Sequence, residues 1–219
     1  MQSLRIAVLL VCAAPCSAAA QGAVVQTEQV RAELVVDAPN GLAAGRVAWL
    51  GLALAHQAHW HSYWKNPGDS GMATTLRWTL PSGATAGAID WPTPQRLPVG
   101  PLVNYGYEGE LLLAVPLTLA QGARATPLEV KLNAQWLVCK DVCIPQSGEF
   151  ALRITAGSSD AALVQHGAAF ARARATLPRT LPGVTPIARV DAQALALDVQ
   201  GLPPTWQGRA IDFFAEDAG

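Results

Sequence analysis

The stretch VKLNAQWLVCKDVCIPQSGEFALRI, residues 130–154, carries two alternating patterns with two cysteines between them. Side chains alternate between the two faces of a β-strand, so residues of one parity share a face. The first pattern places apolar residues on one face: Val130, Leu132, Ala134, Trp136 and Val138. The second pattern, residues 150–154, also places its apolar residues on one face. The stretch therefore predicts two strands joined by a turn.

Spacing decides how Cys139 and Cys143 can meet. On one straight strand their Cα atoms would lie about 13 Å apart, from four steps of about 3.3 Å. A disulfide needs Cα atoms less than about 7 Å apart. The chain must therefore turn at residues 140–142 if the sulfurs bond, and Pro145 helps to turn it back. This places the pair at the end of a hairpin.

The pair allows three interpretations. A structural disulfide is the usual one for an exported protein, but closing so short a loop stabilises by only about 2 kcal/mol in the loop-entropy model. A reversible pair is the second, since strained or exposed disulfides are the more easily reduced ones. A Cu(I) or Zn(II) site is the third, with His59 and His61 on one face of a strand beside the thiolates. The residues favour surface or supporting histidines over this site.

The first residues, MQSLRIAVLLVCAAPCSAAAQG, have the layout of a secretory signal peptide. Arg5 precedes a short apolar run, and small residues lead to an expected cleavage site after residue 20. Cleavage of residues 1–20 removes Cys12 and Cys16 and leaves only the hairpin pair. Export puts that pair in an oxidising compartment, where disulfides persist, and we expect a bacterial periplasm.

Composition excludes some classes of partner. The chain has 219 residues, of which 51% are hydrophobic and 14% charged, with a net charge of -1. Nucleic acid and anionic membranes both call for a basic excess, so neither is expected as a partner. The apolar fraction is ample for a core.

The pattern between residues 24 and 157 is that of short strands separated by turns, which predicts an all-β, antiparallel β-sandwich. Further runs read as strands: residues 30–36, 47–55, 73–80 and 110–119. Residues 158–178 predict a connector helix, with Ser158 or Ser159 as N-cap and Pro178 after its end. Residues 184–219 predict the start of a second β domain from strands at 185–190, 194–199 and 209–215. We expect this domain to be truncated.

Three motifs, in this order, resemble a known family: HWHSYWKNPGDSG (residues 59–71), WPTPQRLPVGPLVNYGYEGELLL (91–113) and WLVCKDVCIPQSGEF (136–150). They are similar to the N-terminal periplasmic domain of the DsbD-type thiol:disulfide interchange reductases, closest to the suppressor-of-copper-sensitivity B (ScsB) branch. The resemblance covers about residues 30–177. Trp136, the cysteine pair and Pro145 carry most of its weight.

The resemblance implies an immunoglobulin-like domain in which Cys139 and Cys143 form one reversible pair. A membrane-embedded reductase domain, in the same or a separate chain, would reduce the pair. The electrons would then pass to periplasmic thioredoxin-like proteins, with no cofactor. The family pattern favours Cys143 as the attacking thiol, and a longer chain would be tethered to the inner membrane.

The resemblance also assigns roles around the pair. Tyr105 and Tyr107 would belong to a cap loop that shields it, and Glu108 would handle protons; ordinary sheet packing is the alternative for the tyrosines. Lys140 favours a thiolate and Asp141 opposes it, so the local charge does not settle how readily a thiolate forms. His61 is a supporting residue. The cysteine spacing is shorter than in the best-known members, and the copper branch keeps a copper-binding module as an alternative.

Overall fold

The computed structural model describes residues 22–122, 127–154, 163–191, 194–206 and 208–217. The expected signal peptide and the expected N-caps Ser158 and Ser159 lie outside these residues. None of the helices in the described ranges is long and apolar enough to cross a membrane.

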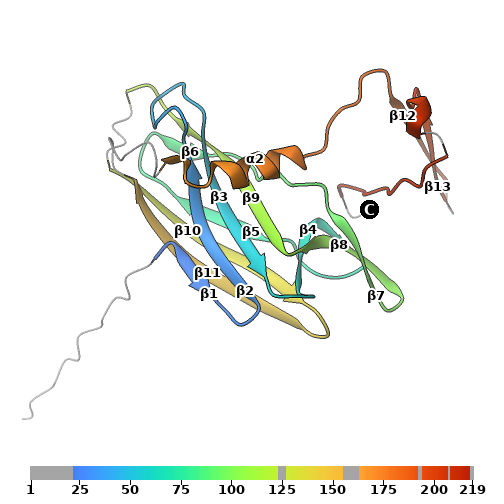
Figure 1. The fold of residues 1–219 in the computed structure, drawn as a ribbon, viewed down its shortest axis with the longest axis horizontal. Helices are drawn as coiled ribbons and strands as arrows, with labels where there is room; N and C mark the ends of the chain where they lie inside the picture. Colours follow the sequence, from blue (N-terminus) through green and yellow to red (C-terminus); the bar gives the residue numbers. More distant parts are fainter. Residues whose placement is uncertain (1–21, 123–126, 155–162, 192–193, 207, 218–219) are drawn as a thin grey trace, which may run out of the picture.

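Two antiparallel sheets face each other (Figure 1). The first has the order β1 (Val24–Gln26), β2 (Val30–Asp37), β3 (Ala48–His56), β9 (Glu110–Leu119) and β6 (Ala84–Ala86). The second has the order β11 (Cys143–Ile154), β10 (Leu128–Cys139), β4 (His61–Gly68), β8 (Leu102–Glu108) and β7 (Gln95–Val99), and β5 (Thr75–Thr79) also pairs with β10. The predicted antiparallel, immunoglobulin-like β-sandwich is confirmed.

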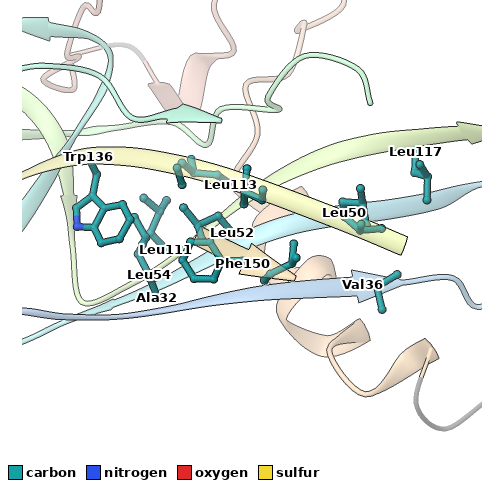
Figure 2. Packing of buried hydrophobic residues seen from close by; sticks show 14 of the residues in the cluster. Ala32, Val36, Leu50, Leu52, Leu54, Leu111, Leu113, Leu117, Trp136 and Phe150 are labelled. Carbon is teal, nitrogen blue, oxygen red and sulfur yellow. The ribbon is translucent and has the colours of Figure 1, made fainter. Parts of the chain in front are cut away.

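The core lies between the two sheets and contains the apolar face predicted for residues 130–138. Each of the five residues on that face of β10 is at most 2% exposed. Figure 2 shows Trp136 and Phe150, from β10 and β11, beside leucines of β3 and β9. Alternation along β10 thus gives one buried face, and this burial fixes which side of the strand meets the core.

Strands β10 and β11 form the predicted hairpin over their full lengths. Their register runs without a shift from the Leu128–Ile154 pair to the Cys139–Cys143 pair. The two cysteines are therefore the last partners of the ladder, next to the turn at residues 140–142. The long paired ladder holds the turn at a fixed place at the end of the sandwich.

Helix α2 (Gly167–Ala175) lies against the outer face of the first sheet (Figure 1). Its Phe170 is fully buried in a small cluster with Val35, Leu112 and Ala114. The helix lies within residues 158–178, where the sequence predicts one. The contact of Phe170 with β9 explains how a helix with only one large apolar side chain is held on the sandwich.

The segment after α2 contains two of the three predicted strands. Strands β12 (Thr185–Val190) and β13 (Leu195–Gln200) pair with each other, and a short 3-10 helix, η1 (Pro204–Trp206), follows. The third predicted strand, residues 209–215, is wrong, because this segment is not a strand. Phe214 instead packs edge-to-face on Trp64 and Tyr105, and Asn66 Nδ2 donates to the carbonyl of Ala215 at 2.9 Å. These contacts with the sandwich replace pairing with β12 and β13.

Candidate functional site

The site is built on the tip of the β10–β11 hairpin. Cys139 and Cys143 form a disulfide with a Cα–Cα distance of 4.1 Å. The turn between them is closed by the Lys140 N–H, which donates to the Val142 carbonyl at 3.1 Å. Lys140, Asp141 and Val142 are exposed. The turn is therefore open to solvent next to the disulfide.

The two sulfurs are not equivalent. Cys139 is only 2% exposed, whereas Cys143 is exposed. In thiol–disulfide exchange, access decides which sulfur is attacked or attacks. The geometry therefore makes Cys143 the cysteine that another protein can reach, and Cys139 the one that can reach only its neighbours.

A row of four reactive side chains crosses the second sheet at this tip. Cys143 of β11 pairs with Cys139 of β10, Cys139 with His61 of β4, and His61 with Glu108 of β8. Residues directly opposite each other on neighbouring strands have Cβ atoms about 4.5–5.5 Å apart, on the same face. Because Val138 faces the core, the row lies on the outer face of the sheet. The fold thus aligns two sulfurs, an imidazole and a carboxylate.

Tyr63 contacts this row and is not among the site residues predicted from the sequence. Its hydroxyl lies 3.8 Å from Cys143 Sγ, and its ring meets the His61 ring edge-to-face with centroids 5.3 Å apart. Burial raises the pKa of Tyr63, so the hydroxyl keeps its proton at neutral pH. Gly71, at φ +108°, packs on the ring, where a Cβ would clash with the ring atom Cε1. The sequence does contain a signal for this contact: in a strand, residues 61 and 63 lie on the same face, which puts Tyr63 beside His61.

His61 is a buried base with an unused nitrogen. It is 5% exposed, and its Nε2 atom has no hydrogen-bond partner within the described part of the chain. Burial lowers the pKa of His61, and the Glu108 carboxylate opposes this shift only in part. The imidazole is therefore neutral at pH 7 and free to accept a proton.

His56 holds the strands around His61 in place. Its Nδ1 donates to the Gly109 carbonyl at 2.7 Å, because a carbonyl can only accept, and its Nε2 lies 3.0 Å from Ser62 Oγ. In the neutral ring Nε2 then accepts from the hydroxyl. Burial lowers the pKa of His56, the Gly109 hydrogen bond raises it, and His61 lowers it further. This links the turn after Glu108 to the strand that carries His61.

The two tyrosines predicted for the cap make contacts on the face of β8 opposite the cysteine row. Tyr107 is 6% exposed, and its hydroxyl donates to the Pro92 carbonyl at 2.7 Å. Tyr105 packs edge-to-face on Trp64 and Phe214. Tyr105 and Tyr107 share one face of β8, whereas Glu108 lies in the row on the opposite face. Their shielding role stays a prediction, and the described contact with Cys143 is made by Tyr63.

Trp136 anchors the hairpin below the cysteines. It is 1% exposed, and its Nε1–H donates to Gln146 Oε1 at 3.0 Å. Gln146 in turn donates through Nε2 to Gln29 Oε1 at 2.8 Å. Pro145 lies opposite Leu137 in the same ladder. Through Gln146, the Trp136 indole thus links both hairpin strands to the segment at Gln29.

The histidines do not favour the copper-binding alternative. His59 lies in the turn between β3 and β4 at φ +68° and is exposed, so it does not share a strand face with His61. Among the described residues, no group of three or more His, Cys, Asp and Glu side chains is placed to hold a metal ion.

Comparisons with known proteins agree with this geometry. The family model described as "Thiol:disulfide interchange protein DsbD, N-terminal" matches residues 27–154, which include both cysteines. The crystal structure of the N-terminal periplasmic domain of ScsB from Proteus mirabilis is similar in fold, with a TM-score of 0.62, 18% identity, and coverage of 83% of this chain and 69% of that one. The yeast GGA1 GAE domain matches with a TM-score of only 0.33, 13% identity, and coverage of 60% and 99%. No curated protein sequence matches the chain.

Proposed function

The chain belongs to the family of N-terminal DsbD domains of thiol:disulfide interchange proteins and is a thiol:disulfide exchange domain, and we propose that it relays electrons in the periplasm through Cys139 and Cys143. A membrane-embedded reductase domain, of the same or another chain, reduces the pair. Periplasmic thioredoxin-like proteins with a disulfide receive the electrons. The periplasmic setting is supported by the signal-peptide pattern and by the periplasmic ScsB domain of similar fold.

The observation that carries this proposal is the difference in exposure between the two cysteines. A relay needs one sulfur that a partner can reach and a second that resolves the mixed disulfide from inside. Cys143 is exposed, and Cys139 is 2% exposed. A bridge that only stabilises the fold needs no such division.

The electrons and protons balance over two steps. Cys143 loses its proton to solvent, and its thiolate attacks a partner disulfide, so that one partner sulfur leaves as a thiolate. Cys139 then gives up its proton and attacks Cys143 Sγ, which breaks the mixed disulfide and releases the second partner sulfur. The domain ends as a disulfide, and the partner, after taking up two protons, ends as a dithiol.

In this relay the surrounding residues have supporting roles. Tyr63 contacts Cys143 on the outer face and has a hydroxyl that can donate to its thiolate. Trp136 and Pro145 hold the hairpin. Lys140 and Asp141 lie on the exposed turn that a partner meets first. Glu108 and His61 extend the row away from the cysteines.

The proposal is tested by mixing the reduced domain with an equimolar amount of an oxidised, periplasmic disulfide isomerase of the thioredoxin fold. Acid quenching, alkylation and mass spectrometry then count free thiols on both proteins. We expect the isomerase to gain two thiols as the domain loses two, much faster than with glutathione disulfide at the same concentration. A Cys139→Ser/Cys143→Ser double variant is the control. Transfer no faster than to glutathione disulfide would contradict the relay.

A further inference from the structure

The resolving cysteine of the relay is placed where a thiol is slow to lose its proton. Cys139 is 2% exposed, and burial away from water disfavours the charged thiolate, so a buried thiol holds its proton more firmly than one in water. Only the thiolate is an effective nucleophile in disulfide exchange. The second step of the relay therefore needs a base inside the protein, next to Cys139.

The cross-strand partner of Cys139 is His61. The two side chains share the outer face of the sheet at the separation of directly opposed residues, and both are buried. The Nε2 atom of His61 has no hydrogen-bond partner in the described residues while the cysteines are bonded to each other. A buried polar atom is normally paired, so an unpaired one needs an explanation. Reduction of the disulfide creates a thiol that would be its missing partner.

We propose that His61 is the proton acceptor for the Cys139 thiol in the resolving step. This role rests on the proposed relay. As Cys139 Sγ attacks Cys143 Sγ, the Cys139 proton moves to Nε2 of His61. The bond between Cys143 and the partner breaks, and the partner sulfur leaves as a thiolate with the electron pair. The imidazolium then passes its proton to that thiolate or to water, and His61 is neutral again.

The charged and titratable groups around His61 agree with a base that is neutral at rest and tolerates a brief positive charge. Glu108, its partner on β8, favours the imidazolium. Burial, and to a lesser degree His61 itself, lowers the pKa of His56, on β3, so that His56 stays neutral beside His61. Tyr63, which contacts its ring, stays neutral because burial raises its pKa. Glu108 alone is less suited to be the acceptor, because it is one strand further from Cys139.

The two steps can be timed separately with a small aromatic disulfide, 5,5′-dithiobis(2-nitrobenzoate). Attack by Cys143 on this probe releases one coloured thiolate, and attack by Cys139 on the mixed disulfide releases the second. We expect His61→Gln to leave the first phase within about twofold and to slow the second by about 100-fold at pH 7, as for loss of a general base. His59→Gln, at the exposed histidine two residues away, should change neither phase.

The pH profile separates a proton acceptor from a structural residue. In the unaltered domain the second phase should rise with pH up to the His61 pKa, below 6.5, and then stay level. In His61→Gln it should keep rising to pH 9, where hydroxide takes the proton, so the difference between the proteins narrows.

Two results would overturn the role of His61. One is a second phase in His61→Gln with the unaltered rate and profile. The other, which needs no variant, is a second phase in the unaltered domain that keeps rising tenfold per pH unit from pH 7 to 9. Either result, if both thiolates are still released in two phases, contradicts only the role of His61 and not the relay. If the unaltered domain transfers no electrons to the isomerase, the relay itself is contradicted.

Discussion

Replacing Cys143 by serine should stop electron transfer to a thioredoxin-like partner, with a rate loss of at least about 1000-fold, as expected when a nucleophile is removed. The reason is that Cys143 carries the exposed sulfur of the pair, whereas Cys139 is 2% exposed. A reduced Cys143→Ser domain therefore keeps a thiol that a partner cannot reach. Thiol counting after mixing with the oxidised isomerase measures this loss.

The matched variant is Cys139→Ser, which keeps the exposed thiol and lacks the resolving one. It should attack the partner at close to the normal rate and then stop as a mixed disulfide, visible as one covalent complex under non-reducing conditions. If Cys139→Ser failed to attack and Cys143→Ser gave the trapped complex, the roles would be reversed.

Replacing Trp136 by alanine should destabilise the oxidised domain by about 3–5 kcal/mol, the usual range for truncating a buried large aromatic residue. The side chain is 1% exposed in the core, and its loss also leaves Gln146 without the indole donor. Equilibrium unfolding in denaturant, followed by circular dichroism, measures the change in the free energy of unfolding.

Two further variants control for the size and the position of the indole. Trp136→Phe keeps most of the packing and loses the hydrogen bond, so its loss should be clearly smaller. Trp206→Ala removes a tryptophan that is 43% exposed and should stay within about 0.5 kcal/mol. Equal losses for Trp136→Ala and Trp206→Ala would contradict the assignment of Trp136 to the core.

The hairpin could be predicted from the sequence because its signals are local. Alternation over residues 130–138 sets the buried face, and the spacing of Cys139 and Cys143 requires a turn between them. The register that follows brings the cysteines together as partners. All of this depends on residues within one hairpin.

The row across the sheet could not be predicted, because it depends on strand order. His61, Glu108 and Cys139 come from three distant segments, and only the pairing of β4 with both β8 and β10 aligns them. The contact of Tyr63 with Cys143 has the same origin: their positions in sequence are 80 residues apart. Alternation gives the face of each side chain, but not its neighbour on the next strand.

The failed prediction at residues 209–215 also has a non-local cause. The segment has the apolar content of a strand, but Phe214 finds its contacts on the aromatic rings of Trp64 and Tyr105. Ion pairs of Lys65 with Glu216 at 2.9 Å and of Arg96 with Asp212 at 3.4 Å lie on either side of it. Local propensity is overridden here by packing against the sandwich.

The reduction potential of the Cys139–Cys143 pair decides whether this disulfide opens and closes in a relay. The domain is equilibrated in thiol buffers of known potential, and the alkylated cysteines are counted. We expect a value between those of thioredoxin, about -270 mV, and protein disulfide isomerase, about -180 mV, since the pair must accept electrons from one kind of protein and give them to the other. A value well below about -300 mV would mark a bridge that stays closed and would contradict a relay through Cys139 and Cys143.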